Sequence, residues 1–278
     1  MTARVLVAYA GGAAAHGAAA SERLFPEAEL LPLPNFQAVA QATITGESSF
    51  GVLAIESSLA GPVVETHDLL HDSALSIVGE TTIPIRHHLV GNAEIALEHV
   101  RIVRSHPSAL EQCRRLLDGM PRAQRIAAAT TADAAGQVAL AGDATQVAIA
   151  SDRAAHHYGL RVIASDVGDD SDAYTRFVSL ATYTRIDGGG NTWRTAFSFV
   201  TDHRAGALHA AIEPFARHGI DLVQLVSRPL PRTSWRYRFD AVLAGHPLDD
   251  QAGQALAEVR ERVVRLRIFG SYPAGSAS

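Results

Sequence analysis

Short apolar runs alternate with Ala-rich stretches along the first two thirds of the chain. The run at residues 50–56 (FGVLAIE) is continuous up to its final Glu, which is typical of a strand covered on both faces of a sheet. The alternation predicts an α/β domain with mostly parallel strands. The expected strands lie at residues 4–10, 51–56, 75–91, 99–106, 125–131, 146–151 and 161–169, and the expected helices at residues 13–25, 63–72, 107–120, 132–143 and 152–160.

The pattern changes after the run RIDGGGNT at residues 185–192, which predicts a linker because three consecutive glycines are costly inside a helix or strand. The segments that follow have the βαββαβ order of a ferredoxin-like unit. They lie at residues 193–201, 205–219, 220–229, 234–245, 249–263 and 264–272. The expected division is a first domain at 1–184, a linker at 185–192, a second domain at 193–273 and a disordered tail at 274–278.

Composition and charge narrow the class of protein. The chain is 47% hydrophobic and 19% charged, with a net charge of −5, so it is globular and has no basic face for nucleic acid. A single cysteine, Cys113, excludes an internal disulfide framework and suits a reducing cytosol. No segment approaches the roughly 18 uninterrupted apolar residues that span a bilayer. We therefore expect a soluble, cytoplasmic protein.

Polar residues stand where several expected strands end, which is where ligands bind in open α/β sheets. Ser105 or His106 is expected to cap the helix that begins at Pro107, and Thr130 or Thr131 the helix after the next strand. Helix starts of this kind attract anions, but ordinary capping gives the same sequence pattern.

Thr175 and Arg176 follow an acidic run at residues 169–172 and precede an apolar strand. A guanidinium beside a hydroxyl can hold a carboxylate bidentately. Alternatively, Arg176 balances the acidic run. The adjacent pair His87-His88 does not share a face of a helix or strand, and no metal-ligand spacing occurs. The Gly-rich stretch at residues 8–17 (AYAGGAAAHG) lacks the nucleotide-binding patterns, so we expect neither a metal nor a nucleotide cofactor.

Six segments occur in an order and spacing that resemble bacterial prephenate dehydratase. They read IESSLAGPVVETHDLL, IVGETTIPIRHHL, SHPSALEQC, ADAAGQVA, AIASDRAAHHYGL and YTRF, and the second half, with GALHAAIEPFARHGIDL and SRPL, resembles the ACT regulatory domain that follows the catalytic domain in this family. The resemblance implies a two-lobed catalytic domain similar to periplasmic binding proteins, with its site between the lobes. It also implies cofactor-free conversion of prephenate to phenylpyruvate with loss of water and carbon dioxide, in phenylalanine biosynthesis.

The resemblance also carries site residues by position. It implies Thr175 and Glu56 as catalytic residues. The implied substrate-binding residues are Ser57, Ser58, Ser105, Gln112, Thr131 and Arg176. The implied effector-binding residues are Gly206, Ala207, Leu208, Asp221, Ser227, Arg228 and Pro229.

Four departures from the family pattern leave alternatives open. Ser57 replaces an Asn, residues 11–16 lack the Thr and Ser hydroxyls of the N-terminal motif, Val226 replaces a Glu and Asp221 an Asn. The chain could act on arogenate, decarboxylate prephenate without aromatisation, or bind an amino acid without catalysis. Because a ferredoxin-like unit has an open edge, we also expect a homodimer or homotetramer.

Overall fold

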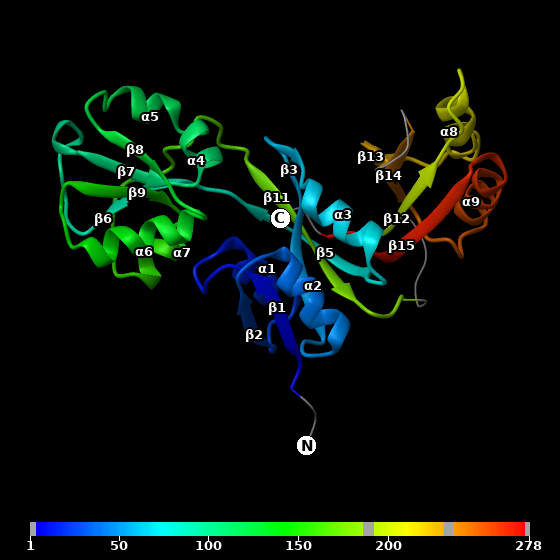
Figure 1. Ribbon diagram of the computed structural model, residues 1–278, viewed down its shortest axis with the longest axis horizontal. Helices are drawn as coiled ribbons and strands as arrows, with labels where there is room; N and C mark the ends of the chain where they lie inside the picture. The colour runs from blue at the N-terminus through cyan, green and yellow to red at the C-terminus, as the bar shows by residue number, and fades with distance from the viewer. Residues whose placement is uncertain (1–3, 186–191, 231–235, 276–278) are drawn as a thin grey trace.

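The computed structural model describes residues 4–185, 192–230 and 236–275. Two lobes and a C-terminal domain stand in a row, with the first lobe in the middle (Figure 1). Most of the expected linker, the end of the expected tail and residues 234–235 of one expected strand lie outside the described residues.

Lobe one is built on a sheet of order β2-β1-β3-β11-β5, to which β4 adds beside β3. Its strands are β1 (Leu6–Ala10), β2 (Glu29–Leu33), β3 (Phe50–Ser57), β4 (Gly61–Pro62), β5 (Ser76–Pro84) and β11 (Tyr174–Ala181), and its helices are α1 (His16–Leu24), α2 (Phe36–Thr45) and α3 (Val64–Asp72). The sequence pattern had not predicted β2 and α2. β2 contains Pro32, which an edge strand tolerates, and Asn35 caps α2 by accepting from the Ala38 amide at 2.8 Å.

Lobe two is built on a sheet of order β10-β6-β9-β7-β8. Its elements are β6 (His88–Gly91), η1 (Leu97–His99), β7 (Ile102–Ser105), α4 (Pro107–Glu111), α5 (Arg114–Asp118), β8 (Gln124–Ala127), α6 (Thr131–Ala141), β9 (Gln146–Ala150), α7 (Asp152–His157) and β10 (Arg161–Ala164). The single helix expected at 107–120 is interrupted. The Asp169 carboxylate accepts from the amides of Arg114 and Arg115 at 2.9 and 3.1 Å, and it thereby starts α5 as a separate helix.

The chain crosses between the lobes twice, from β5 to β6 and from β10 to β11. The strands next to these crossings pair antiparallel, as β11 does with β3 and β5, and as β6 does with β9 and β10. The expectation of mostly parallel strands was therefore wrong. β1 pairs in parallel with β2 and β3, and β7 with β8 and β9, but the strands beside the crossings join the same sheets in the antiparallel direction.

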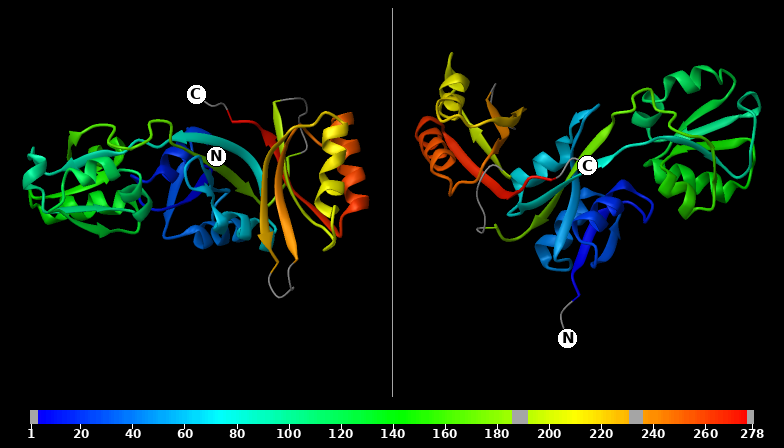
Figure 2. Two further views of the ribbon diagram at one scale, coloured as in Figure 1. Left: turned by 90° about the horizontal axis from the view of Figure 1, so that it is seen from above. Right: turned by 180° about the vertical axis from the view of Figure 1, so that it is seen from behind.

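The C-terminal domain has the expected βαββαβ order and an antiparallel sheet of order β13-β14-β12-β15. Its elements are β12 (Trp193–Val200), α8 (Ala207–Arg217), β13 (Leu222–Pro229), β14 (Tyr237–Ala244), α9 (Asp250–Arg262) and β15 (Arg265–Pro273). Helices α8 and α9 cover the outer face of this sheet, and lobe one lies against the other face (Figure 2).

The C-terminal domain and lobe one share one apolar core. Ala196, Val242, Phe269 and Tyr272 belong to the same buried cluster as Leu53 and other residues of lobe one. Gly270, at φ 147°, allows the backbones to approach, because a Cβ there would lie 2.1 Å from the Ile77 carbonyl oxygen.

Candidate active site

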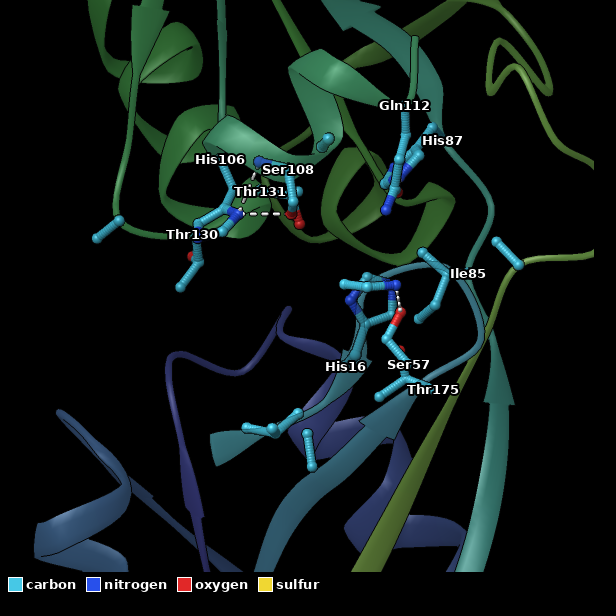
Figure 3. Close-up of a pocket in the computed structure, with 16 residues that line it drawn as sticks. His16, Ser57, Ile85, His87, His106, Ser108, Gln112, Thr130, Thr131 and Thr175 are labelled. Carbon is cyan, nitrogen blue, oxygen red and sulfur yellow. Dashed lines mark hydrogen bonds between the residues drawn. The ribbon is translucent and has the colours of Figure 1, made fainter. Parts of the chain in front are cut away.

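A cavity of about 320 Å³ is bounded by both lobes (Figure 3). Its described lining consists of hydroxyls, imidazoles, one amide and apolar groups. The lining residues are His16, Ala54, Ser57, Ala60, Val63, Ile85, His87, His106, Ser108, Ala109, Gln112, Ala129, Thr130, Thr131, Ala173 and Thr175.

Ser57 and Thr175 form the hydroxyl-bearing wall on lobe one. They are register partners on the antiparallel strands β3 and β11, so their side chains lie together on one face of the sheet. Ser57 ends β3, and its Oγ accepts from the amides of Leu59 and Ala60 at 3.3 and 3.2 Å. These two bonds fix the turn into β4 and hold the Ser57 oxygen at the strand end.

Two helix starts form the facing wall on lobe two. Thr130 caps α6, accepting from the Asp133 amide at 2.9 Å, and Thr131 is the first helical residue. The positive end of the α6 dipole is therefore at the cavity, where it favours an anion. His106 caps α4, accepting from the Ser108 amide at 3.3 Å, and its Nδ1 lies 2.7 Å from the Ser108 Oγ.

His87 and Gln112 close the cavity between these walls. The His87 Nε2 lies 2.8 Å from the Gln112 Oε1. Burial lowers the pKa of His87 from its usual value, while the bond to Gln112 opposes that shift. His87 therefore favours its neutral form, and it fixes the orientation of the Gln112 amide.

His16 is the third imidazole of the cavity, and it lies beside Ser57 and Thr175 (Figure 3). Burial, and then the nearby His87 and Arg153, lower the pKa of His16 to about 4. At neutral pH His16 is therefore uncharged and can donate one hydrogen bond and accept another. Sequence reasoning had missed both His16 and His87, because it weighed histidines only as metal ligands.

Comparison with known proteins identifies the family of this site. A family model described as prephenate dehydratase matches residues 7–185. The chain belongs to the prephenate dehydratase family. It is 36% identical over 279 residues to arogenate dehydratase/prephenate dehydratase 2 of Arabidopsis thaliana, covering 97% of this chain and 73% of that one.

Two solved structures resemble the whole chain of this prephenate dehydratase family member. The Arthrobacter aurescens prephenate dehydratase in complex with L-Phe has a TM-score of 0.88 and 28% identity, covering 97% of this chain and 90% of that one. GqqA, described as a novel type of quorum quenching acylase, has a TM-score of 0.86 and 29% identity, covering 97% and 98%. The two-lobed fold with its C-terminal domain is thus that of the family.

The cavity brings together four of the eight residues that the family resemblance implied for catalysis and substrate binding, namely Ser57, Gln112, Thr131 and Thr175. The other four do not line it. Glu56 pairs with Arg176 at 3.0 Å, one residue along the same two strands from Ser57 and Thr175. Successive strand residues point to opposite faces, so this ion pair lies on the side of the sheet away from the cavity.

Ser58 and Ser105 have structural partners instead. The Ser58 Oγ accepts from the Tyr174 amide at 2.9 Å and so ties the β3 turn to the start of β11. Ser105 is completely buried and donates to the Ile149 carbonyl at 2.7 Å, between β7 and β9. The helix cap expected from Ser105 or His106 comes from His106.

The implied effector residues lie in three places in the C-terminal domain. Gly206, at φ 80°, precedes α8, and Ala207 and Leu208 line a small cavity of about 170 Å³. Ser227, Arg228 and Pro229 end β13, where Arg228 pairs with Asp68 of α3 at 3.0 Å. Asp221 is exposed just before β13. Arg228 thus already has a carboxylate partner from lobe one.

Other candidate chemistry is limited in the described segments. Burial raises the pKa of the Cys113 thiol to about 12, so this cysteine is a poor nucleophile. In residues 4–185, 192–230 and 236–275, no group of three or more His, Cys, Asp or Glu side chains is placed to hold a metal ion. Within the same ranges, every helix is too short or too polar to cross a membrane.

Proposed function

We propose that the protein catalyses the decarboxylating dehydration of prephenate to phenylpyruvate. The observation that carries this proposal is the facing of Thr175 and Ser57 on lobe one with Gln112 and the start of α6 on lobe two, in a chain of this family. The cavity offers hydroxyl and amide groups for a small polar substrate, and an anion seat at a helix end.

The reaction requires that the substrate carboxylates are held in place and that the departing ring hydroxyl is stabilised. Prephenate carries two carboxylates and a ring hydroxyl, and the carbon–carbon bond to the ring carboxylate and the carbon–oxygen bond to the hydroxyl break as the ring becomes aromatic. The α6 start at Thr130 and Thr131 suits a carboxylate. We assign to Thr175, which lines the cavity, the hydrogen bond to the departing oxygen, where negative charge develops.

The site stabilises the departing oxygen by hydrogen bonds rather than by full proton transfer from a side chain. A threonine hydroxyl is too weak an acid to protonate the departing oxygen fully, so the site works by hydrogen bonding and leaves the proton to come from water. His16, uncharged and next to Thr175, supplies a further donor or acceptor in the same wall. Glu56 contributes indirectly, because it holds Arg176 near the start of β11.

The direct test is purified protein mixed with prephenate, with phenylpyruvate followed by absorbance and products identified by mass spectrometry. We expect phenylpyruvate without added metal or nucleotide, and unchanged rates in EDTA. A parallel reaction with arogenate measures the ratio of kcat/KM for the two substrates. A product that keeps its ring hydroxyl, or binding without turnover in calorimetry, would contradict the proposal.

A second candidate function rests on a different observation. The Ser108 Oγ lies 2.7 Å from the His106 Nδ1 within the cavity, and a hydroxyl paired with an imidazole is the arrangement used in hydrolytic acyl transfer. The likeness to GqqA, described as an acylase, favours the same chemistry. Release of p-nitroaniline from an N-acyl-p-nitroanilide by the wild type, and its loss in Ser108→Ala, would establish this function.

The same family membership supports an amino-acid effector at the C-terminal domain, since the Arthrobacter aurescens relative was solved with L-Phe. We place this effector at Ala207 and Leu208, which line the small cavity before α8. A cytoplasmic location is part of the proposal and is supported by the single, buried Cys113.

A further inference from the structure

The loop before α1 leaves lobe one and packs against lobe two. Gly11, at φ 97°, turns the chain away from the end of β1. Ala14 is only 2% exposed, and it belongs to the apolar cluster of lobe two that contains Val90, Ala135 and Ala154. In Figure 1 this blue loop reaches toward α7, while the two chain crossings between the lobes run above it.

Arg153, in the first turn of α7, binds both ends of the segment 13–22, which consists of the end of this loop and most of α1. Its two terminal nitrogens donate to the two carboxylate oxygens of Glu22, each at 2.7 Å. Its Nε donates to the Ala13 carbonyl at 3.1 Å. Ser151 fixes the turn of α7 that presents Arg153, by accepting from the Ala154 amide at 3.2 Å. A planar guanidinium can satisfy all three acceptors at once, which an ammonium cannot do with this geometry.

His16 lies between the two anchoring points. Ala13 precedes it by three residues and Glu22 follows it by six, on the same helix that His16 begins. The contacts of Arg153 therefore determine where the His16 ring stands in the cavity. They also join lobe one to lobe two at a place separate from the two chain crossings.

We propose that Arg153 is a positioning residue for the reaction, which clamps the segment 13–22 to α7 and holds the two lobes at the separation that the substrate requires. The kinetic part of this inference rests on the proposed function. Because the substrate would contact both walls of the cavity, loosening the clamp lowers the fraction of protein that is competent to bind it. The effect falls mainly on KM rather than on kcat.

The test compares Arg153→Gln and Glu22→Gln with Arg125→Gln as control, since Arg125 makes an exposed pair with Asp118 at 3.5 Å inside lobe two. The side chains of Arg153 and Glu22 are 38% and 49% exposed, so the pair is moderately screened. We expect both variants to raise the KM for prephenate by about three- to tenfold and to change kcat less than about twofold. The control should match the wild type.

Amide hydrogen exchange supplies a readout that does not depend on turnover. Exchange in residues 11–24 should become faster in Arg153→Gln and Glu22→Gln, and the double variant Arg153→Glu, Glu22→Arg should recover part of the protection and of the KM. Unchanged exchange in both single variants would overturn the inference, as would equal losses in the Arg125→Gln control. If the wild type does not convert prephenate, the proposed function fails, and the exchange experiment alone decides whether the clamp exists.

Discussion

Glu56 and Arg176 form an ion pair across β3 and β11, and their immediate neighbours Ser57 and Thr175 face the cavity from the same two strands. The alternation of strand side chains thus separates the carboxylate from the hydroxyls. Family resemblance had implied both Glu56 and Thr175 as catalytic residues. Of these two residues only Thr175 lines the cavity, and this difference leads to two opposite expectations for their variants.

Thr175→Ala should lower kcat by about 100-fold, which corresponds to about 3 kcal/mol of transition-state stabilisation. The reason is the loss of the hydroxyl beside the departing oxygen. Thr175→Ser should recover part of the rate. Thr82→Ala is the matched control. Thr82 lies on β5 as the register partner of Arg176 on β11, and it does not line the cavity. An alanine variant with near wild-type turnover would remove Thr175 from the mechanism.

Glu56→Gln should reduce the free energy of unfolding by about 1 kcal/mol, because it leaves Arg176 without its charged partner. The side chains of Arg176 and Glu56 are 23% and 29% exposed, so the pair is only partly screened by water. We expect kcat to stay within about threefold of the wild type. Urea denaturation and steady-state kinetics measure the two quantities. A loss of kcat as large as that of Thr175→Ala would show that the carboxylate takes part in the chemistry.

Acid should destabilise the protein through His16. Its pKa in the folded chain is about 4, against an ordinary value of 6.5, so the unfolded chain binds the proton more readily between these two values. This contribution to stability is complete above about pH 6.5 and is lost as the pH falls toward 4.

The variant His16→Gln should therefore show a weaker pH dependence of the unfolding free energy than the wild type. Urea denaturation at pH 7, 6 and 5 measures it. His156→Gln, at an exposed position of α7, is the control and should follow the wild type. Parallel curves for the wild type and His16→Gln would contradict the assignment.

Arg238→Met should lower the free energy of unfolding by about 3–5 kcal/mol, since it leaves a buried carboxylate with too little compensation. The Arg238 and Asp240 side chains are 4% and 3% exposed and lie 3.2 Å apart, and Arg238 also pairs with Asp68 of lobe one at 2.7 Å. Arg265→Gln, at an exposed position of β15, is the control for loss of a positive charge. A loss below about 1 kcal/mol would mean that His67, 3.3 Å from Asp240, compensates alone.

L-Phenylalanine should inhibit weakly. The family resemblance implies a Glu at Val226, which offers no hydrogen bond, and the loss of one charge-assisted contact weakens binding by roughly 10- to 150-fold. Val226 lies opposite Asp240 on β14 and does not line the small cavity at Ala207 and Leu208, so this prediction requires that the effector also reaches β13. A dose-response curve checks this, and Val226→Gln should lower the half-inhibition concentration by restoring a polar group. Half-inhibition of the wild type at low micromolar concentration would show that the substitution is compensated.

The sequence was sufficient for features that depend on local pattern. The apolar run at 50–56 became β3, and the order of elements after residue 192 predicted the ferredoxin-like domain. The helix start at Thr130 followed from a hydroxyl before an Ala-rich segment. Ser57, Gln112, Thr131 and Thr175 line one cavity, and their assignment to the substrate site stays a prediction.

Other features depend on contacts that no local pattern records. The break between α4 and α5 is made by Asp169, more than 50 residues away along the chain. Ser105 points inward because the Ile149 carbonyl lies next to it on β9. The roles of His16 and Arg153 required knowing that lobe two meets the loop before α1. Homodimer or homotetramer formation through the C-terminal sheet stays a prediction, which light scattering can check.

The apolar core shared by lobe one and the C-terminal domain has a consequence for how such proteins can be recombined. Because Phe269 and Tyr272 pack among Leu53 and Ile77, the C-terminal domain is part of the interior of lobe one. A chimaera that replaced residues 193–275 would need to reproduce the apolar face of the C-terminal sheet as well as its fold. The two halves are therefore expected to vary together in evolution, as one inherited unit.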